Sequence, residues 1–504
     1  MSLALVFTRA GVGVEAPEVV VEIHLSGGLP GMSIVGLPET AVREARDRVK
    51  AALLNAGYNF PQRRVTIALA PADLPKEGSR FDLPIALGIL AASKQLPSDK
   101  LEAFEFIGEL SLSGELKPVK GVLPVAIQAC KARRGLVVPA GNAVEASLAD
   151  GKDIFEATSL PDVVSWMFGR SKLREVVKRK SEPILNSEDL SDVIGQQRPR
   201  RALEVAAAGG HNILFTGSPG TGKTMLASRL PGILPPMKDN EALEVAAIAS
   251  VSQLGLDLSR WHCRPFRAPH HTASAIALVG GGSKPRPGEI SLAHNGVLFL
   301  DELPEFNRHV LEVLREPLES GKISISRALR CETFPARFQL VAAMNPCPCG
   351  YAGDESGQCH CSSDLVSRYR GRISGPLLDR IDLHVEVNRP RSFLIQHDGP
   401  RPESSAAVRK RVLAARAIQH MRSLCTNAQL GADELKQHCR LATADRELLI
   451  EASRMHALSP RACIRILKVA RTIADLDSKP TISKDHLLEA VSYRDGSSAN
   501  AFRF

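Results

Sequence analysis

The chain has 504 residues, of which 44% are hydrophobic and 24% are charged, and this length exceeds what one hydrophobic core normally holds, so we expect two to four domains. The net charge of +9 fits a polyanionic partner, and fits a basic enzyme without such a partner equally well. Aromatic residues make up only 4%, which disfavours nucleic-acid binding dominated by stacking of bases on aromatic side chains.

The sequence carries no pattern typical of secretion or of a membrane span. No cationic segment precedes the short apolar run at the N-terminus, so we expect no secretory signal. No apolar stretch approaches the ~20 residues needed to cross a bilayer. Ten cysteines without such a signal favour reduced thiols or metal ligands over disulfides. We therefore expect a cytoplasmic protein without a membrane partner.

Residues 1–170 mix strand and helix patterns, which predicts an α+β domain. Alternating apolar residues predict strands at 21–26 and 63–70, and an apolar stripe between them predicts an amphipathic helix over 38–58. The run FIGELSLSGELKPVKG predicts a hairpin that turns near Ser113 and Gly114. Residues 171–190 are charged and interrupted by proline, so we expect a linker there.

From 191 to 390, strand and helix patterns alternate as in the βαβ units of a parallel sheet. The apolar run HNILFT is followed by GSPGTGKT and then by a helix pattern, which is the context of a phosphate-binding loop. We expect the backbone N–H groups of this loop to bind the phosphates of ATP, Lys223 to reach the β- and γ-phosphates, and Thr224 to bind Mg²⁺. The loop residues are Gly217, Ser218, Pro219, Gly220, Thr221, Gly222, Lys223 and Thr224.

Two further predicted strands end in polar residues. The run GVLFLDELPEF places Asp301 and Glu302 behind a buried strand, and FQLVAAMNP places Asn345 behind another. Because ligands gather at the carboxyl ends of parallel strands, we expect Asp301 to assist Mg²⁺ binding and Glu302 to orient and deprotonate the attacking water. Asn345 is expected to hold that water or to sense the γ-phosphate. A helix-capping role is the structural alternative for the acidic pair.

Four cysteines follow Asn345 directly. Their spacing is C-x-C-x9-C-x-C, which offers four soft ligands for a closed tetrahedral Zn²⁺ site, or three with His360 replacing one sulfur. The one-residue spacers are tighter than is usual for zinc, so a set of reduced loop cysteines is the alternative. Bound zinc would fix the loop that leaves Asn345 and would take no part in catalysis. The four residues are Cys347, Cys349, Cys359 and Cys361.

Beyond residue 390 the patterns are helical. Amphipathic stretches at 404–421, 443–458, 460–476 and 483–494 predict helices that together occupy 391–495. Residues 496–504 are expected to form a loose tail.

These motifs resemble those of the AAA+ ATPases, and within them the Mg-chelatase-like group, over nearly the whole chain. The resemblance implies an arginine finger at Arg380, in SRYRGRISGPLLDRIDLHVEV. It implies a sensor-2 contact to the γ-phosphate at Arg461, in SPRACIRILKVARTIADL, with Arg465 one turn later as the competing choice. It also implies an adenine pocket at Ile194 and Gly195, in DVIGQQRPRRAL. The alternative for each arginine is a solvated helix charge.

The first domain resembles the Lon-protease-like domain found in bacterial DNA-processing ATPases. The positions of the nucleophilic serine and of the lysine in such proteases correspond here to Arg80 and Leu123. Ser79 is one place out of register, and Lys120 lies about three residues early. Because a Ser-Lys dyad needs hydrogen-bond distance between its partners, we expect a non-proteolytic scaffold or DNA platform.

Runs such as GLPGMSIVGLPE, FRAPHHTASAIALVGGG and MNPCPCGY are similar to those of the ComM/YifB family. This resemblance implies a multidomain α/β protein with a Lon-protease-like domain at 1–170, a P-loop AAA+ core with a parallel sheet at 191–390, and a helical lid at 391–495. It implies a homo-hexameric, ATP-dependent DNA helicase that promotes branch migration during natural transformation. Single-stranded DNA, branched duplexes and recombination proteins are its implied partners. The alternatives are a Mg-chelatase-type ATPase motor subunit and an ATP-dependent protease.

Two insertions in the predicted core resemble those that line the central channel of ring helicases in this group. The first, FRAPHHTASAIALVGGGSKPRPGEIS, contains glycines and prolines that exclude a continuous helix, and the second, ESGKISISRALRCETFPARFQL, predicts a β-hairpin. Their basic residues are candidates to contact DNA phosphates, with ordinary surface charge as the alternative. These residues are Lys284, Arg286, Lys322, Arg327 and Arg330. For His270 and His271 we favour hydrogen-bonded loop residues over metal ligands.

Overall fold

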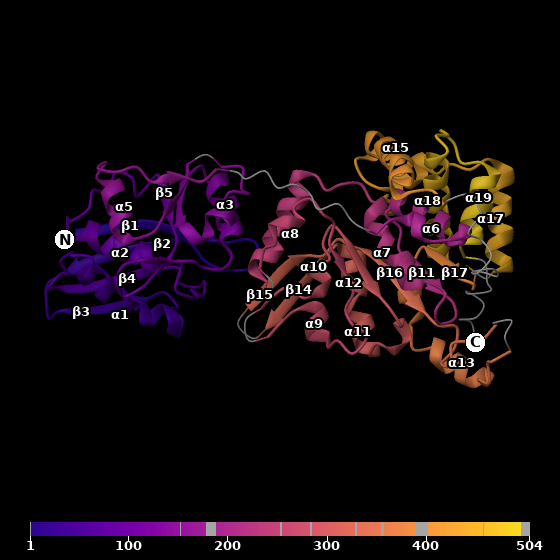
Figure 1. Cartoon of the computed structure of the whole chain (residues 1–504), viewed down its shortest axis with the longest axis horizontal. Helices are drawn as coiled ribbons and strands as arrows, with labels where there is room; N and C mark the ends of the chain where they lie inside the picture. Colours follow the sequence, from indigo (N-terminus) through magenta and orange to yellow (C-terminus); the bar gives the residue numbers. More distant parts are fainter. Residues whose placement is uncertain are drawn as a thin grey trace. The chain divides into compact units, whose positions relative to one another are not determined.

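The computed structural model describes residues 2–151, 153–177, 188–252, 255–282, 285–327, 330–353, 357–389, 402–456 and 458–494. The chain divides into two compact units (Figure 1). Unit 1 combines Met1–Glu182 with Ala242–Trp261, and unit 2 combines Pro183–Glu241 with His262–Phe504. Within the described ranges, no helix is both long enough and apolar enough to cross a bilayer.

Unit 1 is built on an eight-stranded mixed sheet with the order β10-β9-β8-β5-β1-β2-β4-β3. Strand β2 pairs antiparallel with β4, so that Val21 lies opposite Leu69 and Ile23 opposite Ile67. These buried residues confirm the alternation that predicted both strands. The strands are β1 (Ser2–Arg9), β2 (Glu18–Ser26), β3 (Gly31–Val35), β4 (Arg64–Ala70), β5 (Phe104–Phe106), β8 (Gly135–Pro139), β9 (Ile154–Ala157) and β10 (Arg174–Glu175).

The helices of unit 1 cover this sheet. Val42, Ala45, Val49 and Leu53 of α1 are fully buried, which confirms the amphipathic helix predicted there. The short strands β6 (Glu109–Leu110) and β7 (Leu116–Lys117) pair antiparallel, which confirms the predicted hairpin. The helices are α1 (Thr40–Asn55), α2 (Asp82–Ala92), α3 (Val122–Lys131), α4 (Ala143–Ala146) and α5 (Leu160–Met167), with a 3₁₀ turn at Ala140–Asn142.

The positions compared with a protease dyad have other partners. Ser79 donates a hydrogen bond to the carboxylate of Glu109, and Lys120 is exposed. Leu123 is fully buried in an apolar cluster. Arg80 donates to the carbonyl of Lys120 at 2.8 Å, and burial lowers the pKa of Arg80 to about 10. The hydrogen bond from Ser79 to Glu109 is therefore a different contact from the one that a Ser-Lys dyad needs.

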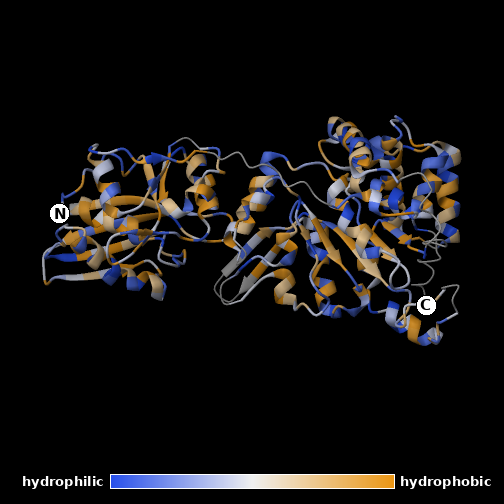
Figure 2. Ribbon diagram, in the orientation of Figure 1, coloured by the Kyte–Doolittle hydropathy of each residue, from blue (hydrophilic) through white to orange (hydrophobic). Residues whose placement is uncertain are grey.

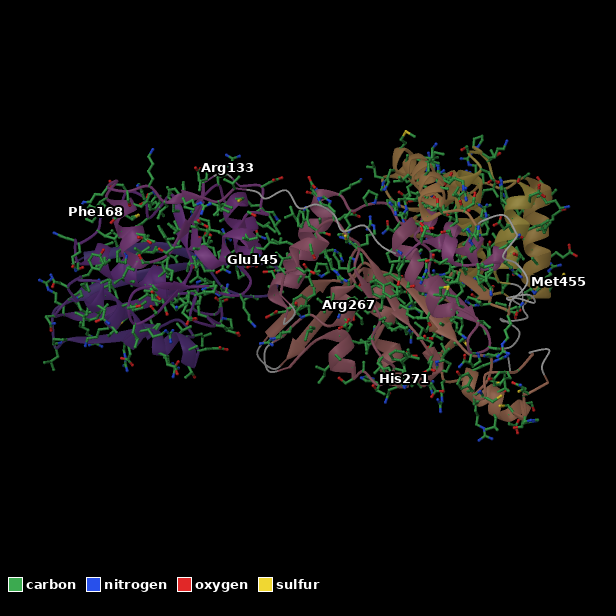
Figure 3. All side chains as sticks on the ribbon, viewed as in Figure 1. Arg133, Glu145, Phe168, Arg267, His271 and Met455 are labelled. Carbon is green, nitrogen blue, oxygen red and sulfur yellow. The ribbon has the colours of Figure 1, made fainter. Side chains whose placement is uncertain are left out.

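A segment from the middle of the sequence belongs to unit 1. Helix α8 (Asp239–Val251) begins in unit 2, and the residues from Ala242 onward group with the N-terminal residues. Ala246 is buried in a cluster with residues of α3 and β8, and Leu256 and Trp261 pack against it. Glu145, labelled in Figure 3, accepts hydrogen bonds from the backbone N–H of Val122 at 3.2 Å and from the Ser250 hydroxyl. Nothing in the sequence pattern indicated this grouping.

Unit 2 contains a five-stranded sheet with the order β12-β13-β16-β11-β17. Every pairing within it is parallel, which confirms the predicted parallel sheet and places all carboxyl ends at one edge. Strands β11, β13 and β16 are buried along their whole length, because helices cover both faces of a sheet of this kind. The strands are β11 (Ile213–Thr216), β12 (Phe266–Arg267), β13 (Val297–Leu300), β16 (Gln339–Met344) and β17 (Leu383–Glu386). Figure 2 shows that these strands are hydrophobic.

Most helices around this sheet are short, and only α6 and α7 among those named next exceed ten residues. The helices are α6 (Gln197–Gly209), α7 (Lys223–Ile233), α9 (Ala275–Val279), α10 (Glu289–Leu292), α11 (Arg308–Val313), α12 (Arg315–Ser320), α13 (Ser363–Arg370) and α14 (Gly375–Leu378), with 3₁₀ turns at Leu190–Asp192, Leu258–Arg260 (in unit 1) and Leu303–Glu305. Strands β14 (Lys322–Arg327) and β15 (Arg330–Pro335) pair antiparallel, so the hairpin predicted for the second insertion is confirmed.

The C-terminal part of unit 2 is helical, as predicted. It contains α15 (Ser405–Ser423), α16 (Ala432–His438), α17 (Thr443–Met455), α18 (Pro460–Leu476) and α19 (Lys484–Ser492), with a 3₁₀ turn at Asn427–Gln429. Helices α15 and α18 pack on α6, and the two regions share one apolar core (Figure 1). Arg416 of α15 donates to the carbonyl of Ala207 at 2.7 Å, and Gln419 donates to that of Ala208 at 3.2 Å. The tail predicted at 496–504 lies outside the described residues, as do 178–187 of the predicted linker.

A buried polar network fixes α18 at the amino end of β17. Asp382 accepts hydrogen bonds from the backbone N–H of Asn212 at 3.0 Å and from Arg465 at 2.5 Å. Burial acts to raise the pKa of Asp382, but the hydrogen bond from His211 and the charge of Arg465 hold it well below its ordinary value. Arg465 therefore anchors α18 at the sheet edge opposite the strand ends that precede the phosphate-binding loop.

His384, on β17, gives a testable dependence of stability on pH. Burial lowers the pKa of His384 to about 3 in the folded protein, whereas an unfolded histidine titrates near 6.5. The unfolded state binds more protons between these values, so stability is complete above about pH 6.5 and falls as pH decreases toward 3. Between pH 6.5 and 5, the free energy of unfolding should therefore fall more steeply for the wild type than for His384→Gln. The difference between the two slopes is expected to be about 1.4 kcal/mol per pH unit.

Urea unfolding of the full chain at several pH values measures this difference. His309→Gln, at an exposed position on α11, is the matched control and is expected to follow the wild type. Equal slopes for the wild type and His384→Gln would contradict the prediction.

Candidate active site

The parallel sheet of unit 2 brings the predicted site residues to one edge. The phosphate-binding loop follows β11, Asp301 and Glu302 follow β13, and Asn345 follows β16. These three strands are neighbours in the sheet, in the order β13-β16-β11. Residues that are far apart in the sequence therefore meet at the carboxyl ends of adjacent strands, where ligands of such sheets bind.

The backbone of the phosphate-binding loop requires glycine at several positions. Gly220 and Gly222 have φ values of +75° and +92°, which side chains other than glycine rarely adopt. A Cβ on Gly217 would lie 2.2 Å from the carbonyl oxygen of Val387, so no larger residue fits beside β17. Helix α7 starts at Lys223, which aims its N-terminus at this loop and suits an anion there.

Lys223 is held inside the loop. Its Nζ donates to the carbonyl of Gly217 at 2.6 Å, to that of Ser218 at 3.0 Å, and to Oδ1 of Asn345 at 3.1 Å. Burial lowers the pKa of Lys223, and the nearby Asp301 and Glu302 act in the opposite direction. The ammonium group and the amide of Asn345 thus converge on the place where phosphate oxygens would bind.

Thr224 and Asp301 form a pair of hard oxygen donors. The Thr224 hydroxyl donates to Oδ2 of Asp301 at 2.8 Å, and Oδ1 of Asp301 accepts the backbone N–H of Glu302 at 2.9 Å. A hydroxyl and a carboxylate beside a phosphate site are the donors that Mg²⁺ prefers, because it binds oxygen and usually shares its ligands with a phosphate. This donor set fits Mg²⁺.

Glu302 has a histidine partner that sequence reasoning missed. His271, labelled in Figure 3, places Nδ1 2.9 Å from Oε2 of Glu302. His270 makes a different contact, between its Nδ1 and the hydroxyl of Thr272 at 2.9 Å, and the two imidazole rings lie 4.1 Å apart. The interpretation as a hydrogen-bonded loop residue is therefore confirmed for His270, whereas His271 lies at ion-pair distance from Glu302. The signal available in the sequence was the position of His271 behind β12.

The four cysteines form a compact sulfur cluster. Their Sγ atoms all lie within 4.8 Å of one another, and Cys347 Sγ lies 3.2 Å from that of Cys349 and 3.8 Å from that of Cys359. Tetrahedral zinc with Zn–S bonds of about 2.3 Å requires sulfurs about 3.8 Å apart, so the cluster fits zinc without His360. A hydrogen bond from the backbone N–H of Tyr351 lowers the pKa of Cys349 to about 6, which favours the thiolate at this one sulfur. At Cys361 a backbone hydrogen bond acts to lower the pKa, whereas hydrogen bonding with the side chain of Cys349 acts in the opposite direction and the pKa is raised to about 11.

The cysteine loop packs on the phosphate-binding loop. Gly350 lies so close to Pro219 that an added Cβ would be 2.6 Å from Pro219 Cδ and 3.9 Å from Cγ of Asn345. Arg370 of α13 donates to the carbonyl of Pro346 at 3.0 Å. A metal that fixed the cysteine loop would thereby also fix one wall of the nucleotide site.

Arg380 makes contacts within its own chain. It donates to the carbonyl of Pro376 at 2.6 Å and to the carboxylate of Glu319 on α12, and its side chain is 7% exposed. Arg461 is exposed in the first turn of α18. The structure thus shows Arg380 in an ion pair within its own chain and Arg461 at the surface.

The segment predicted to line the adenine pocket is linked to the phosphate-binding loop. Ile194 is half exposed, and Gly195 has a φ of +69°. Gln196, which the sequence did not single out, donates to the carbonyl of Asn388 at 2.6 Å and lies 3.5 Å from that of Thr221. Gln196, which directly follows Ile194 and Gly195, therefore lies beside the phosphate-binding loop.

The two insertions differ in how much of them is described. In the first, α9 ends before Gly280, which has a φ of +100° and where a Cβ would lie 2.1 Å from the carbonyl oxygen of Arg286, so the prediction that no continuous helix spans this insertion is confirmed. Arg286 and Lys322 are exposed. Lys284 and the side chains of Arg327 and Arg330 lie outside the described part of the structure.

The chain is similar to known proteins over nearly its whole length. Three family models match it: magnesium chelatase, subunit ChlI, at 189–393; subunit ChlI of Mg-chelatase at 21–142; and magnesium chelatase, subunit ChlI C-terminal, at 402–494. The competence protein ComM of Haemophilus influenzae is 54% identical over 500 residues, which cover 98% of both chains. The protein YifB of Escherichia coli is 51% identical over 496 residues, 98% of this chain and 97% of that one. A magnesium-chelatase 38 kDa subunit of Cereibacter sphaeroides is 25% identical over 218 residues, 40% of this chain and 59% of that one.

Proposed function

Because the chain belongs to the ComM/YifB family, we propose that it is an ATP-dependent DNA motor that promotes branch migration of recombination intermediates during natural transformation. The observation that carries the proposal is the convergence of Lys223, the Thr224–Asp301 pair, Glu302 and Asn345 at one sheet edge. The family relationship, with its Mg-chelatase-like AAA+ module, indicates an ATPase.

Each side chain at this edge has a distinct part in ATP hydrolysis. Lys223 is placed to neutralise charge that develops on the β- and γ-phosphates. Glu302 is placed to orient the attacking water and to accept its proton, and Asn345 to hold that water or the γ-phosphate. Thr224 and Asp301 would hold Mg²⁺, which supplies further charge neutralisation on the phosphates.

We assign DNA contacts to the two insertions and hydrolysis to an assembled ring. Arg286 and Lys322 are exposed on these insertions, and such cations supply most of the sequence-independent affinity for a phosphate backbone. A homo-hexamer would let each subunit complete the site of its neighbour through Arg380, with Arg461 as the sensor-2 contact. ATP turnover would then move DNA through the ring.

An assay on synthetic four-way junctions tests this function. The purified chain is expected to migrate the junction only with ATP and Mg²⁺, and its ATPase rate is expected to rise with single-stranded or branched DNA. Lys223→Ala is the negative control. If DNA neither bound nor altered the ATPase rate, the DNA-motor proposal would be wrong. The chelatase alternative, whose name the matching family model carries, predicts an ATPase insensitive to DNA.

We also propose that the cysteine cluster binds one structural zinc ion per chain. The protein purified without chelators is expected to contain about one equivalent of zinc, and the double variant Cys359→Ser, Cys361→Ser to lose it. Because the cysteine loop contacts Pro219, loss of zinc should also raise the KM for ATP. Cys263→Ser, outside the cluster, is the control. Elemental analysis that found no zinc in the wild-type chain would refute this proposal.

A further inference from the structure

The chain segment that carries Arg380 is held by its backbone. The side-chain amide of Asn212 donates to the carbonyl of Arg380 at 3.0 Å. The guanidinium of Arg494 donates to the next two carbonyls, those of Ile381 and Asp382. The N–H of Asp382 donates to the carbonyl of Asn212 at 3.0 Å, and Oδ2 of Asp382 accepts the N–H of Asn212 at 3.0 Å. Each carbonyl of residues 380–382, the finger segment, therefore has a donor that fixes it.

These donors belong to different parts of unit 2. Asn212 directly precedes β11, the strand that leads into the phosphate-binding loop, and its Oδ1 accepts the N–H of Leu340 on β16 at 2.8 Å. Arg494 follows α19. Arg465 of α18 pairs with Oδ1 of Asp382 at 2.5 Å, and their side chains are 26% and 3% exposed. The finger segment is thus held between the parallel sheet and the C-terminal helices.

The side chain of Arg380 is held less firmly than this backbone. It pairs with Glu319, whose own side chain is 54% exposed, and solvent screening weakens such a pair. Among the described residues, the buried Nε of Arg380 has no hydrogen-bond partner. The guanidinium can therefore leave its resting place while the backbone that carries it stays fixed.

The finger segment lies at the edge of the sheet opposite the phosphate-binding loop. It precedes β17, which pairs parallel with β11, whereas the loop follows β11. Arg465, bonded to Asp382 at this edge, is held away from the nucleotide of its own chain. An effect of Arg465 on hydrolysis would therefore pass through Arg380.

We propose that Arg465 and Asn212 are positioning residues for Arg380, which hold it where it meets the ATP of the neighbouring subunit. This inference rests on the role of Arg380 in the proposed function. A misplacement of about 1 Å can cost about 10²-fold in rate, so a looser finger segment should lose part of the contribution of Arg380. Because neither residue contacts the nucleotide of its own chain, ATP binding should be unchanged.

The steady-state ATPase of the full chain tests the inference. Arg465→Met keeps the apolar stem and is expected to lower kcat about 10- to 100-fold, with KM for ATP changed less than about threefold. Arg465→Lys can keep a cation against Asp382 and should restore most of the lost kcat. Arg416→Met is the matched control, because Arg416 also joins a C-terminal helix to α6, through the carbonyl of Ala207. Its kcat should stay within about threefold of the wild type.

A second variant reaches the finger segment from the other side. Arg465→Met leaves Asp382 buried without its cation, which typically costs about 3–5 kcal/mol and can unfold the chain. Asn212→Ala keeps the pair of Arg465 and Asp382, removes the hydrogen bond to the carbonyl of Arg380, and should lower kcat by a similar factor. Thermal unfolding followed by circular dichroism shows which variants are folded.

Mixed rings separate the positioning of Arg380 from a role in the chain's own nucleotide site. Arg465→Met subunits keep an intact phosphate-binding loop, so mixing them with Lys223→Ala subunits, which keep the finger segment, should restore hydrolysis at shared boundaries. Mixing them with Arg380→Ala subunits should restore none. In a double variant with Arg380→Ala, Arg465→Met should cause no further loss of kcat.

Three results would each overturn the inference. These are an unchanged kcat in the folded variants Arg465→Met and Asn212→Ala, an additive loss in the double variant, and no recovery on mixing with Lys223→Ala subunits. If Arg380→Ala itself kept the kcat of the wild type, the role of Arg380 in the proposed function would be wrong as well. A wild-type chain without ATPase activity would show that the proposed function as a whole is wrong.

Discussion

The variant Lys223→Ala is expected to lose ATP binding and hydrolysis together. Lys223 is buried in the phosphate-binding loop, and its Nζ contacts two loop carbonyls and Asn345. Its removal deletes the only side-chain cation of the loop. The carbonyl oxygens of the loop and Oδ1 of Asn345 would then face the bound phosphate without a cation between them, and these oxygens would repel it. We expect kcat/KM for ATP to fall by about 10³-fold or more, which corresponds to roughly 4 kcal/mol.

Measurements of nucleotide affinity with a fluorescent ATP analogue and of phosphate release check this result. Lys238→Ala, at an exposed position just beyond α7, is the matched control and should behave as the wild type. A Lys223→Ala chain that hydrolysed ATP at more than a tenth of the wild-type rate would show that the nucleotide does not use this loop.

Arg380→Ala is expected to bind ATP normally and to lose hydrolysis. An arginine supplied from a neighbouring subunit stabilises the charge on the transferring phosphoryl group, and its removal typically lowers kcat by about 10³- to 10⁵-fold. In the single chain Arg380 pairs with Glu319 instead, so this role requires the guanidinium to leave that pair when a ring assembles. If the pair is purely structural, Arg380→Ala should lower the thermal stability and leave the kcat of the remaining folded protein unchanged.

Mixing two inactive variants distinguishes these cases. Arg380→Ala subunits keep an intact nucleotide loop, and Lys223→Ala subunits keep the arginine, so mixed rings should regain hydrolysis at shared boundaries. Arg380→Lys keeps the charge without the planar fork and should recover only part of the activity. Glu319→Gln removes the resting partner and should not lower kcat. Absence of recovery in the mixture would contradict the assignment of Arg380.

Most of the nucleotide site could be predicted because its signals are local. The strands β11, β13 and β16 are buried on both faces, so they read as short continuous apolar runs that end in polar residues. The glycines of the phosphate-binding loop and the positions of Asp301 and Asn345 follow directly behind these runs. The rule that ligands bind at the carboxyl ends of parallel strands then predicts that the residues meet.

The contacts that escaped prediction depend on register and on long-range packing. Strand β12 has two residues, too few for any periodic pattern, and only its pairing with β13 shows that His271 reaches Glu302. Arg465 and Arg461 were both candidates on one helix, and only the distance from Arg465 to Asp382 shows that Arg465 is a structural anchor.

Residues 242–261 belong to unit 1 although they lie within the sequence of unit 2, and this limits how the protein can be divided into fragments for experiments. A fragment truncated at residue 182 would lack Ala246, Leu256 and Trp261, and the apolar side of α3 that they cover would face water. A fragment cloned from residue 183 onward would carry the same twenty-residue segment with nothing to bury it, which invites aggregation. To express each unit as a soluble fragment, residues 242–261 should be fused to the N-terminal fragment. In the C-terminal fragment, a short linker should replace them between residues 241 and 262.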